Sequence, residues 1–188
     1  NDLDEARIEA LKVNGATIGI WGVGTRLVTG NDQPALGGVY KLAAIQSDDG
    51  TWEPRLKLSE NAIKVSNPGR QQVRCFTVGG LPACDVIYDP SLGAPPAAGD
   101  VLYRRTDPAS PIRVPDGAVG RDLLAPLLSG GRPVYDAPTL EEIRATAIGE
   151  YALFGGRSAV EYNVGLGRAL YETKMRLVRE ARLDGEVT

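Results

Sequence analysis

Hydrophobic and polar positions divide the chain into three stretches with different periodicities. Residues 2–12 place apolar side chains at helical spacing, and a carboxylate-rich start favours a helix there. Residues 18–21 then form a short run with almost no polar content, which is typical of a buried strand. Together they predict a helix and a strand, which are half of an α/β repeat and need partner strands from outside this stretch.

The middle of the chain carries several short apolar-polar segments of strand type. Clusters of Gly, Pro and Asp separate them, and the short connections favour a mostly antiparallel arrangement. The predicted strands are residues 39–45, 51–58, 72–78, 83–88 and 101–104, with a further candidate at 123–128 and a surface loop at 91–99.

Two cysteines lie in a predicted hairpin. Gly79-Gly80 fits a two-residue turn between residues 73–78 and 81–88, and in that register Cys75 faces Cys84. Reduced thiols packed as small apolar groups are the favoured interpretation for a cytosolic protein, and a disulfide is the alternative. Two cysteines without histidine are too few for a four-ligand zinc site.

The last fifty residues show a helical pattern. Thr139 and Glu142 have the spacing of a capping box at the start of one helix. A second helix is expected over residues 167–182. The expected inner faces consist of Leu140, Ile143, Ala147 and Tyr151 in the first helix region, and Leu166, Leu170, Leu177 and Ala181 in the second.

These patterns predict an α/β chain in three parts. Residues 1–46 are expected to form an α/β segment, residues 47–135 a β-rich lobe and residues 136–188 a C-terminal helical segment. The chain starts without methionine, so we expect it to be a segment of something longer.

Composition and charge exclude several classes of function. The 188 residues are 43% hydrophobic and 24% charged, which is an ordinary globular balance. A net charge of −3 provides no large basic field for nucleic acid or an anionic membrane, and no apolar run is long enough to span a bilayer. No signal peptide is visible. The chain has no histidine, so by itself it lacks every His-dependent mechanism.

The best candidate for a binding site is the turn Gly22-Val23-Gly24-Thr25. Glycines let the backbone approach a ligand, successive N–H groups form an anion cradle, and the Thr25 hydroxyl adds a donor. A tight turn without a ligand is the alternative. Arg26 and Lys41 are candidate charge partners for phosphate or else solvated cations. Asp2 and Asp4 fit helix capping, or carboxylates facing a sugar or a metal.

The order of these motifs resembles the nicotinate phosphoribosyltransferase family, and the resemblance covers nearly the whole chain. The motifs that carry it are Asn1-Asp2-Leu3-Asp4-Glu5, Trp21-Gly22-Val23-Gly24-Thr25-Arg26-Leu27-Val28-Thr29, Pro34-Ala35-Leu36-Gly37-Gly38-Val39-Tyr40-Lys41-Leu42, Lys57-Leu58-Ser59-Glu60, Pro68-Gly69-Arg70, Leu123-Leu124-Ala125-Pro126-Leu127-Leu128, Leu140-Glu141-Glu142-Ile143-Arg144 and Val164-Gly165-Leu166.

The resemblance implies a fold and an activity. The fold is the last part of an irregular α/β barrel of the type II phosphoribosyltransferase kind, followed by the β-rich lobe and the C-terminal helices. The activity is transfer of ribose 5-phosphate from phosphoribosyl pyrophosphate to nicotinate in NAD biosynthesis, coupled to ATP hydrolysis with Mg²⁺ through a phosphorylated histidine. Gly22, Val23, Gly24 and Thr25 would grip the 5-phosphate, Asp2 would face the ribose, and Arg26 and Lys41 lie in matching motifs.

The same resemblance implies that this chain is inactive alone. The phosphorylated histidine, the nicotinate-binding arginines and the earlier barrel strands belong to an N-terminal half, so no catalytic residue and no metal ligand is assigned here. A cytoplasmic homo-oligomer is expected. The alternatives are a nicotinamide or quinolinate phosphoribosyltransferase, a non-catalytic module that binds ribose phosphate, and an α+β domain without a ligand.

Overall fold

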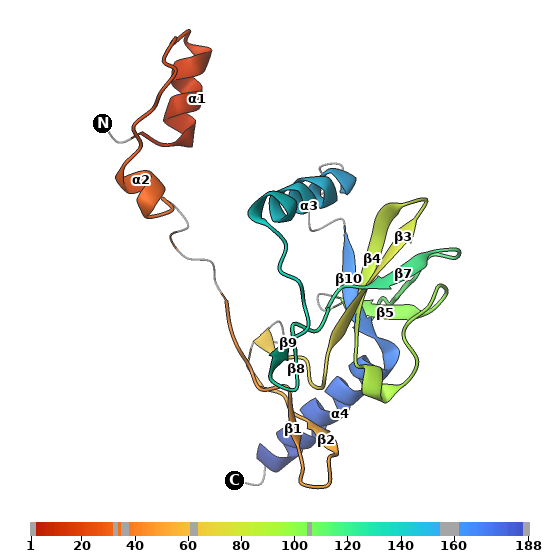
Figure 1. Ribbon diagram of the computed structural model, residues 1–188. Helices are drawn as coiled ribbons and strands as arrows, with labels where there is room; N and C mark the ends of the chain where they lie inside the picture. The colour runs from red at the N-terminus through yellow and green to blue at the C-terminus, as the bar shows by residue number, and fades with distance from the viewer. Residues whose placement is uncertain are drawn as a thin grey trace. The chain divides into compact units, whose positions relative to one another are not determined.

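A computed structural model describes residues 3–31, 34, 38–60, 64–104, 107–154 and 162–185. The chain separates into two compact units, Asn1–Tyr40 and Lys41–Thr188. Figure 1 draws the elements of both units along the chain. None of the helices in the described ranges is long and apolar enough to cross a bilayer.

The first unit contains two helices, α1 (Glu5–Val13) and α2 (Thr25–Val28). Asp4 caps α1, since its Oδ1 accepts the N–H of Arg7 at 2.9 Å. The helix thus begins after Asp4, whereas the sequence pattern placed its start at residue 2. None of the described residues of α1 or α2 is buried.

The predicted buried strand at residues 18–21 is wrong. These residues are irregular, Ile18 is half exposed and 91% of the Ile20 surface is exposed. A strand exists only where its backbone groups pair with a neighbour. The described part of the first unit contains no other strand that could supply this pairing, so the apolar run stays unpaired.

The second unit is built on a mixed sheet of six strands, in the order β6-β5-β10-β4-β3-β7. Strands β10 and β4 are parallel and the other pairs are antiparallel. Their bounds are β3 Gln72–Val78, β4 Leu81–Tyr88, β5 Val101–Arg104, β6 Ile112–Arg113, β7 Val119–Asp122 and β10 Asn163–Gly167. The predicted α/β class is confirmed at this coarse level.

Two short hairpins accompany this sheet. They are β1 (Ala44–Gln46) with β2 (Trp52–Pro54), and β8 (Leu128–Ser129) with β9 (Arg132–Pro133). The predicted strands at 72–78 and 101–104 are confirmed, and those at 39–45 and 51–58 shrink to three residues each. The strand expected at 123–128 instead lies at Val119–Asp122, where Arg74 and Phe76 of β3 pack against Gly120.

The β3–β4 hairpin forms, but its predicted register at the cysteines is wrong. A β-bulge shifts the pairing by one residue between Phe76 and Thr77, so Cys75 lies opposite Asp85, and Cys84 opposite Phe76. Pro82 pairs with Thr77 immediately beyond the shift, and proline in a sheet occurs at edges and bulges because it has no N–H to donate. Both cysteines are free thiols.

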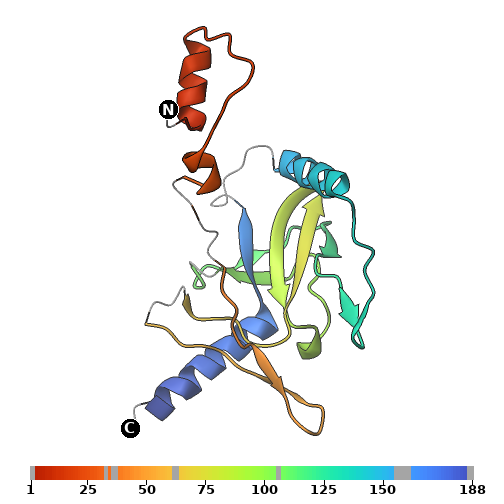
Figure 2. The same ribbon diagram turned by 60° about the vertical axis from the view of Figure 1, so that its left-hand side comes forward.

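The C-terminal segment is not only helical, because β10 inserts between β4 and β5. Gly165 makes this insertion possible: a Cβ there would lie 2.5 Å from Leu102 Cδ1 and 2.8 Å from Tyr103 O. β10 runs directly into α4 (Arg168–Gly185), as Figures 1 and 2 both show.

The hydrophobic core lies on one face of the curled sheet. Its buried members are Phe76, Cys84, Val86, Leu102 and Val114. Val114 and the adjoining Ala118 belong to the connection from β6 to β7, which are the two outer strands of the sheet. This connection therefore joins the two edges of the sheet across the core.

Helix α4 packs on the sheet through the inner face that the sequence predicted. Leu170 is buried, Leu177 and Ala181 are half-buried, and Tyr171 stacks on Tyr103 of β5 with ring centroids 4.2 Å apart. Lys174 is buried on this helix, where its Nζ donates to Asn67 Oδ1 at 2.8 Å.

Helix α3 (Leu140–Leu153) has the predicted capping box but not the predicted buried face. Thr139 accepts the Glu142 N–H at 3.3 Å, and Glu142 Oε2 accepts the Thr139 N–H at 2.7 Å. No residue of α3 is buried, and Leu140 and Tyr151 are more than 70% exposed. Its contacts to the sheet are peripheral, with Arg121 of β7 reaching Glu150 at 3.4 Å.

Candidate functional site

The turn predicted to bind phosphate, residues 22–25, joins an irregular segment to α2 in the first unit. Gly24 is the N-cap residue of α2, and its carbonyl accepts the N–H groups of Leu27 and Val28, both at 3.1 Å. Among the described residues, no atom lies within 4 Å of the position that a Cβ would take at Gly22 or Gly24. The turn is therefore open on the side where an added side chain would project.

The other predicted site residues are only partly brought to this turn. Arg26 adjoins it in sequence and donates to Asn31 Oδ1. Lys41 belongs to the second unit, where its Nζ donates to the Lys64 carbonyl at 3.1 Å. Asp2, the predicted ribose ligand, lies outside the described residues.

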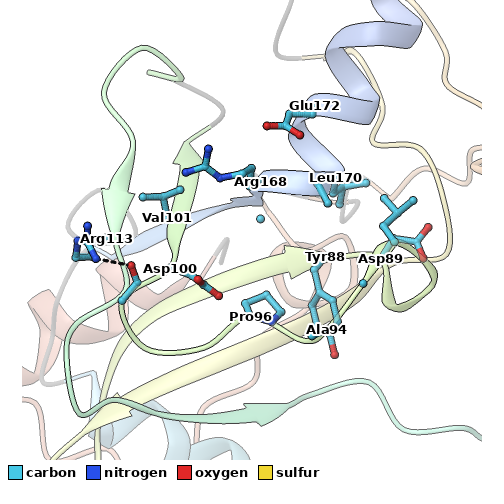
Figure 3. Close-up of a pocket in the computed structure, with 15 residues that line it drawn as sticks. Tyr88, Asp89, Ala94, Pro96, Asp100, Val101, Arg113, Arg168, Leu170 and Glu172 are labelled. Carbon is cyan, nitrogen blue, oxygen red and sulfur yellow. Dashed lines mark hydrogen bonds between the residues drawn. The ribbon is translucent and has the colours of Figure 1, made fainter.

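The second unit contains a cavity that the sequence motifs did not predict. It measures about 400 Å³ and lies at the carboxyl ends of the parallel strands β4 and β10 (Figure 3). Its wall consists of Tyr88, Asp89, Leu92, Gly93, Ala94, Pro96, Gly99, Asp100, Val101, Arg113, Gly167, Arg168, Ala169, Leu170 and Glu172. The carboxyl ends of parallel strands are where ligands bind in open α/β sheets.

Asp89 forms one wall of the cavity, and its carboxylate already accepts hydrogen bonds from neighbouring residues of the protein. Its Oδ2 accepts the Arg70 N–H at 2.8 Å, and its Oδ1 accepts the Ser91 N–H at 2.8 Å and hydroxyl at 2.6 Å. Gly69 lies so close that a Cβ there would be 2.2 Å from Asp89 Oδ2. The Pro68-Gly69-Arg70 motif thus has a structural role, because it holds the Asp89 side chain.

Arg74 and Asp122 form a charged cluster that holds the Tyr88 side chain by its hydroxyl group. Asp122 accepts two bonds from Arg74, at 2.8 Å from Nε and 2.9 Å from NH2, and one from the Tyr88 hydroxyl at 3.1 Å. The Arg74 contact lowers the pKa of Asp122, and the same contact raises the pKa of Arg74. Burial, followed by the Asp122 contact, raises the pKa of the Tyr88 hydroxyl. The cluster fixes the Tyr88 ring at the cavity wall.

Four further charged residues line the cavity with fewer internal contacts. Arg113 donates to the Gly99 carbonyl at 2.7 Å, and Asp100 Oδ2 accepts the Ala97 N–H at 2.8 Å. Arg168 and Glu172 lie one turn apart at the start of α4, and both are exposed. Together with Asp89, the lining therefore holds two guanidinium groups and three carboxylates, of which Asp89 is already bonded within the protein.

The two thiols do not form a nucleophilic site. Burial raises the pKa of Cys84 to about 11, and it also raises the pKa of Cys75. Tyr162 donates to Asp85 Oδ1 at 2.9 Å beside Cys75, and burial raises the pKa of that hydroxyl as well. A thiol that stays protonated at neutral pH is a weak nucleophile, so both cysteines act as packing residues.

No metal-binding group is assigned in the described part of the chain. It contains no cluster of three or more His, Cys, Asp or Glu residues that could hold a metal ion. No chemical step is derived through the Mg²⁺ that the family resemblance implies for the full-length enzyme.

Comparison with known proteins indicates one class of enzyme, the phosphoribosyltransferases that act on a pyridine base. No protein-family model matches the chain. Curated proteins do match it. A nicotinate phosphoribosyltransferase of Bacillus subtilis (strain 168) is 55% identical over 73 residues, which are 39% of this chain. Those of Dictyostelium discoideum and Homo sapiens are 44% and 32% identical, over 47% and 78% of the chain.

These matches confirm the resemblance to nicotinate phosphoribosyltransferases that the sequence motifs indicated. The matched parts are short relative to the relatives themselves. They cover 15% of the Bacillus protein, 14% of the Dictyostelium protein and 26% of the human protein.

Proposed function

We propose that this chain is part of a nicotinate phosphoribosyltransferase, which forms nicotinate mononucleotide from nicotinate and phosphoribosyl pyrophosphate with ATP hydrolysis. The observation that carries the proposal is 55% identity over 73 residues to a protein of that name. The similar proteins share this name across a bacterium, an amoeba and a mammal, which favours nicotinate over nicotinamide or quinolinate as the base.

Within such an enzyme, the first unit would complete the end of the α/β barrel. Residues 18–21 would then find partner strands in the barrel, and the turn at residues 22–25 would lie at the carboxyl end of a strand, where phosphate sites of barrels occur. The open backbone at Gly22 and Gly24 is compatible with this role. Asp2 would face the ribose, and Arg26 would add positive charge beside the turn.

The chemistry assigns these residues a binding role. Loss of pyrophosphate leaves an oxocarbenium-like ribosyl centre, and catalysis consists mainly of holding the phosphate and hydroxyl groups still. A hydrogen bond to the 5-phosphate is equally strong in substrate and transition state. Its loss therefore raises KM for phosphoribosyl pyrophosphate more than it lowers kcat.

The assembled enzyme and the isolated chain should behave differently. We expect the 188-residue chain to form no nicotinate mononucleotide from nicotinate, phosphoribosyl pyrophosphate and ATP. Addition of the upstream half, as a separate chain or in one polypeptide, should restore turnover. Product formation by the isolated chain would contradict the proposed division of roles, and no turnover on nicotinate by the assembled protein would contradict the activity itself.

The role of the turn can be tested in the assembled enzyme with Thr25→Val. We expect KM for phosphoribosyl pyrophosphate to rise about tenfold, as for loss of one hydrogen bond to a charged group, with kcat changed much less. Thr51→Val, in the turn between β1 and β2, is the matched control and should leave both constants unchanged. A fall in kcat with unchanged KM would argue against a ground-state phosphate contact.

A further inference from the structure

We propose that the cavity at the carboxyl ends of β4 and β10 binds the phosphate ester of a small polyhydroxy compound, such as a sugar phosphate or a mononucleotide. This site is additional to the phosphate turn at residues 22–25 and is built entirely from the second unit. The proposal depends on the volume of the cavity, on its two guanidinium groups and on its carboxylates.

The cavity has room for a small molecule, and glycine or alanine occupies five of its fifteen lining positions. Its volume of about 400 Å³ lies within the range of about 300–1,000 Å³ of small-molecule sites. Small residues recur around it: Gly93, Ala94, Gly99, Gly167 and Ala169.

Arg168 carries a positive charge at the N-terminus of α4, where helices usually favour negative charge. Arg168 is the first residue of α4, and the first turn of that helix contains no acidic residue. A cation at a helix N-terminus is disfavoured by the helix dipole. An anion bound beside Arg168 would remove this cost, because it would interact favourably with both the guanidinium and the dipole.

A second guanidinium lies across from Arg168 and belongs to a different element. Arg113, from β6, is held at the wall by its bond to the Gly99 carbonyl at 2.7 Å. Figure 3 shows Arg113 and Arg168 on either side of Val101. Guanidinium groups bind phosphate through paired N–H donors, so two of them in the wall of one cavity favour a phosphate group as part of its ligand.

The carboxylates favour an ester with hydroxyl groups over a bare phosphate ion. Glu172 lies one helical turn after Arg168, and within residues 162–185 no ion pair joins the two. Asp100, at the start of β5, leaves its Oδ1 available beyond the bond that Oδ2 makes to the Ala97 N–H. Carboxylates accept hydrogen bonds from hydroxyl groups and repel phosphate. The lining presents both signs of charge, which suits a ligand that carries both an anionic group and hydroxyl groups.

The proposal can be tested by NMR titration of the isotope-labelled 188-residue chain with ribose 5-phosphate and, separately, with inorganic phosphate. We expect ribose 5-phosphate to shift the backbone amides of Gly167, Arg168 and Ala169 in a saturable manner, and inorganic phosphate to do so more weakly. Shifts at residues 22–25 report the turn instead, so the two sites are read independently. If the amides of residues 167–170 do not respond to either compound, the cavity site is refuted, whatever happens at the turn.

Charge-neutralising variants on α4 sharpen the test. Arg168→Gln should weaken ribose 5-phosphate binding at residues 167–170 by about tenfold, because a charge-assisted contact is lost. Arg176→Gln is the matched control: it lies on the same helix, away from the cavity, and pairs with Glu180 at 3.0 Å. Arg113→Gln provides a second variant on another element. Equal weakening by the control variant, or none by Arg168→Gln and Arg113→Gln, would overturn the proposal.

A third variant separates the two phosphate sources. Glu172→Gln should tighten binding of inorganic phosphate, since a repelling charge is removed, and should reduce the preference for ribose 5-phosphate. If inorganic phosphate binds the unmodified chain as tightly as the sugar phosphate does, the site recognises phosphate alone and the proposed ligand class is wrong.

Discussion

At the scale of single residues, position 69 requires glycine, both because of its backbone angle and because of its close neighbours. Its φ is +83°, and a Cβ would lie 2.2 Å from Asp89 Oδ2. Gly69→Ala should therefore lower the free energy of unfolding by about 3 kcal/mol or more, from the left-handed backbone and the displaced Asp89 contacts together. Chemical denaturation of the variant and the parent chain measures this difference.

Gly50 provides the matched control for this substitution. Its φ of +85° is nearly the same, but nothing in the described residues lies within 4 Å of its Cβ position. Gly50→Ala should thus cost only the backbone component, about 1–2 kcal/mol. Equal losses at the two positions would show that contact with Asp89 contributes nothing.

Asp122 gives the unfolding free energy a pH dependence at the acid end. The Arg74 contact lowers the pKa of Asp122 in the folded chain, so its contribution is present above the unfolded pKa of about 3.9. It is lost as pH falls through the lower folded pKa. Asp122→Asn should therefore destabilise the chain at neutral pH, with the difference from the parent closing as the pH falls below the unfolded pKa of the Asp122 carboxyl.

Denaturation measured across pH 2–7 tests this expectation. Asp48→Asn, an exposed carboxyl in the turn between β1 and β2, is the control and should leave the acid limb of the profile unchanged. A stability difference for Asp122→Asn that stays constant down to pH 2 would contradict the assigned contact.

At the scale of elements, α3 depends on its cap more than on its packing. No residue of α3 is buried, so little tertiary contact supports the helix, whereas the capping box is complete. Thr139→Ala should cost about 1 kcal/mol locally, seen as roughly fivefold faster hydrogen exchange of α3 amides. The amides of β3 and β4 should be unaffected. Glu141→Gln, next to the box but outside it, is the control, and a global loss of protection would argue against a local effect.

At the scale of the whole molecule, the stable core belongs to the second unit. All the buried hydrophobic residues identified among the described ranges lie between Phe76 and Val178. A chain limited to residues 41–188 should therefore unfold at the same denaturant concentration as the full 188 residues. Thermal or urea unfolding followed by tryptophan fluorescence measures this, with Trp21→Phe in the full chain so that Trp52 alone reports in both. A lower midpoint for the shorter chain would show that residues 1–40 stabilise the core.

The elements predicted correctly from sequence are those whose signals are local. Residues 72–78 and 101–104 carry the composition of strands, and Thr139 and Glu142 lie within one helical turn of each other. The strand β10 escaped prediction because Val164, Gly165 and Leu166 do not make a strong strand pattern. It forms because Gly165 lets it fit between β4 and β5, which end 75 and 59 residues before β10 begins.

Of the two candidate sites, one could be predicted from local sequence and the other could not. The glycine turn is contiguous, so four adjacent residues were enough to single it out, and the family resemblance rests on similar contiguous motifs. The cavity combines Tyr88 of β4, Arg113 of β6 and Arg168 at the start of α4, and no spacing in the sequence relates them. They meet because β10 pairs with both β4 and β5, and β5 pairs with β6.

The sequence by itself determined the helix cap, the existence of the hairpin, the glycine turn and the resemblance to nicotinate phosphoribosyltransferases, because each depends on residues close together in the chain. The tertiary structure alone decided the bulge that separates Cys75 from Cys84, the insertion of β10 and the cavity at its end. These depend on close packing and backbone pairing between distant segments, which local propensity does not encode.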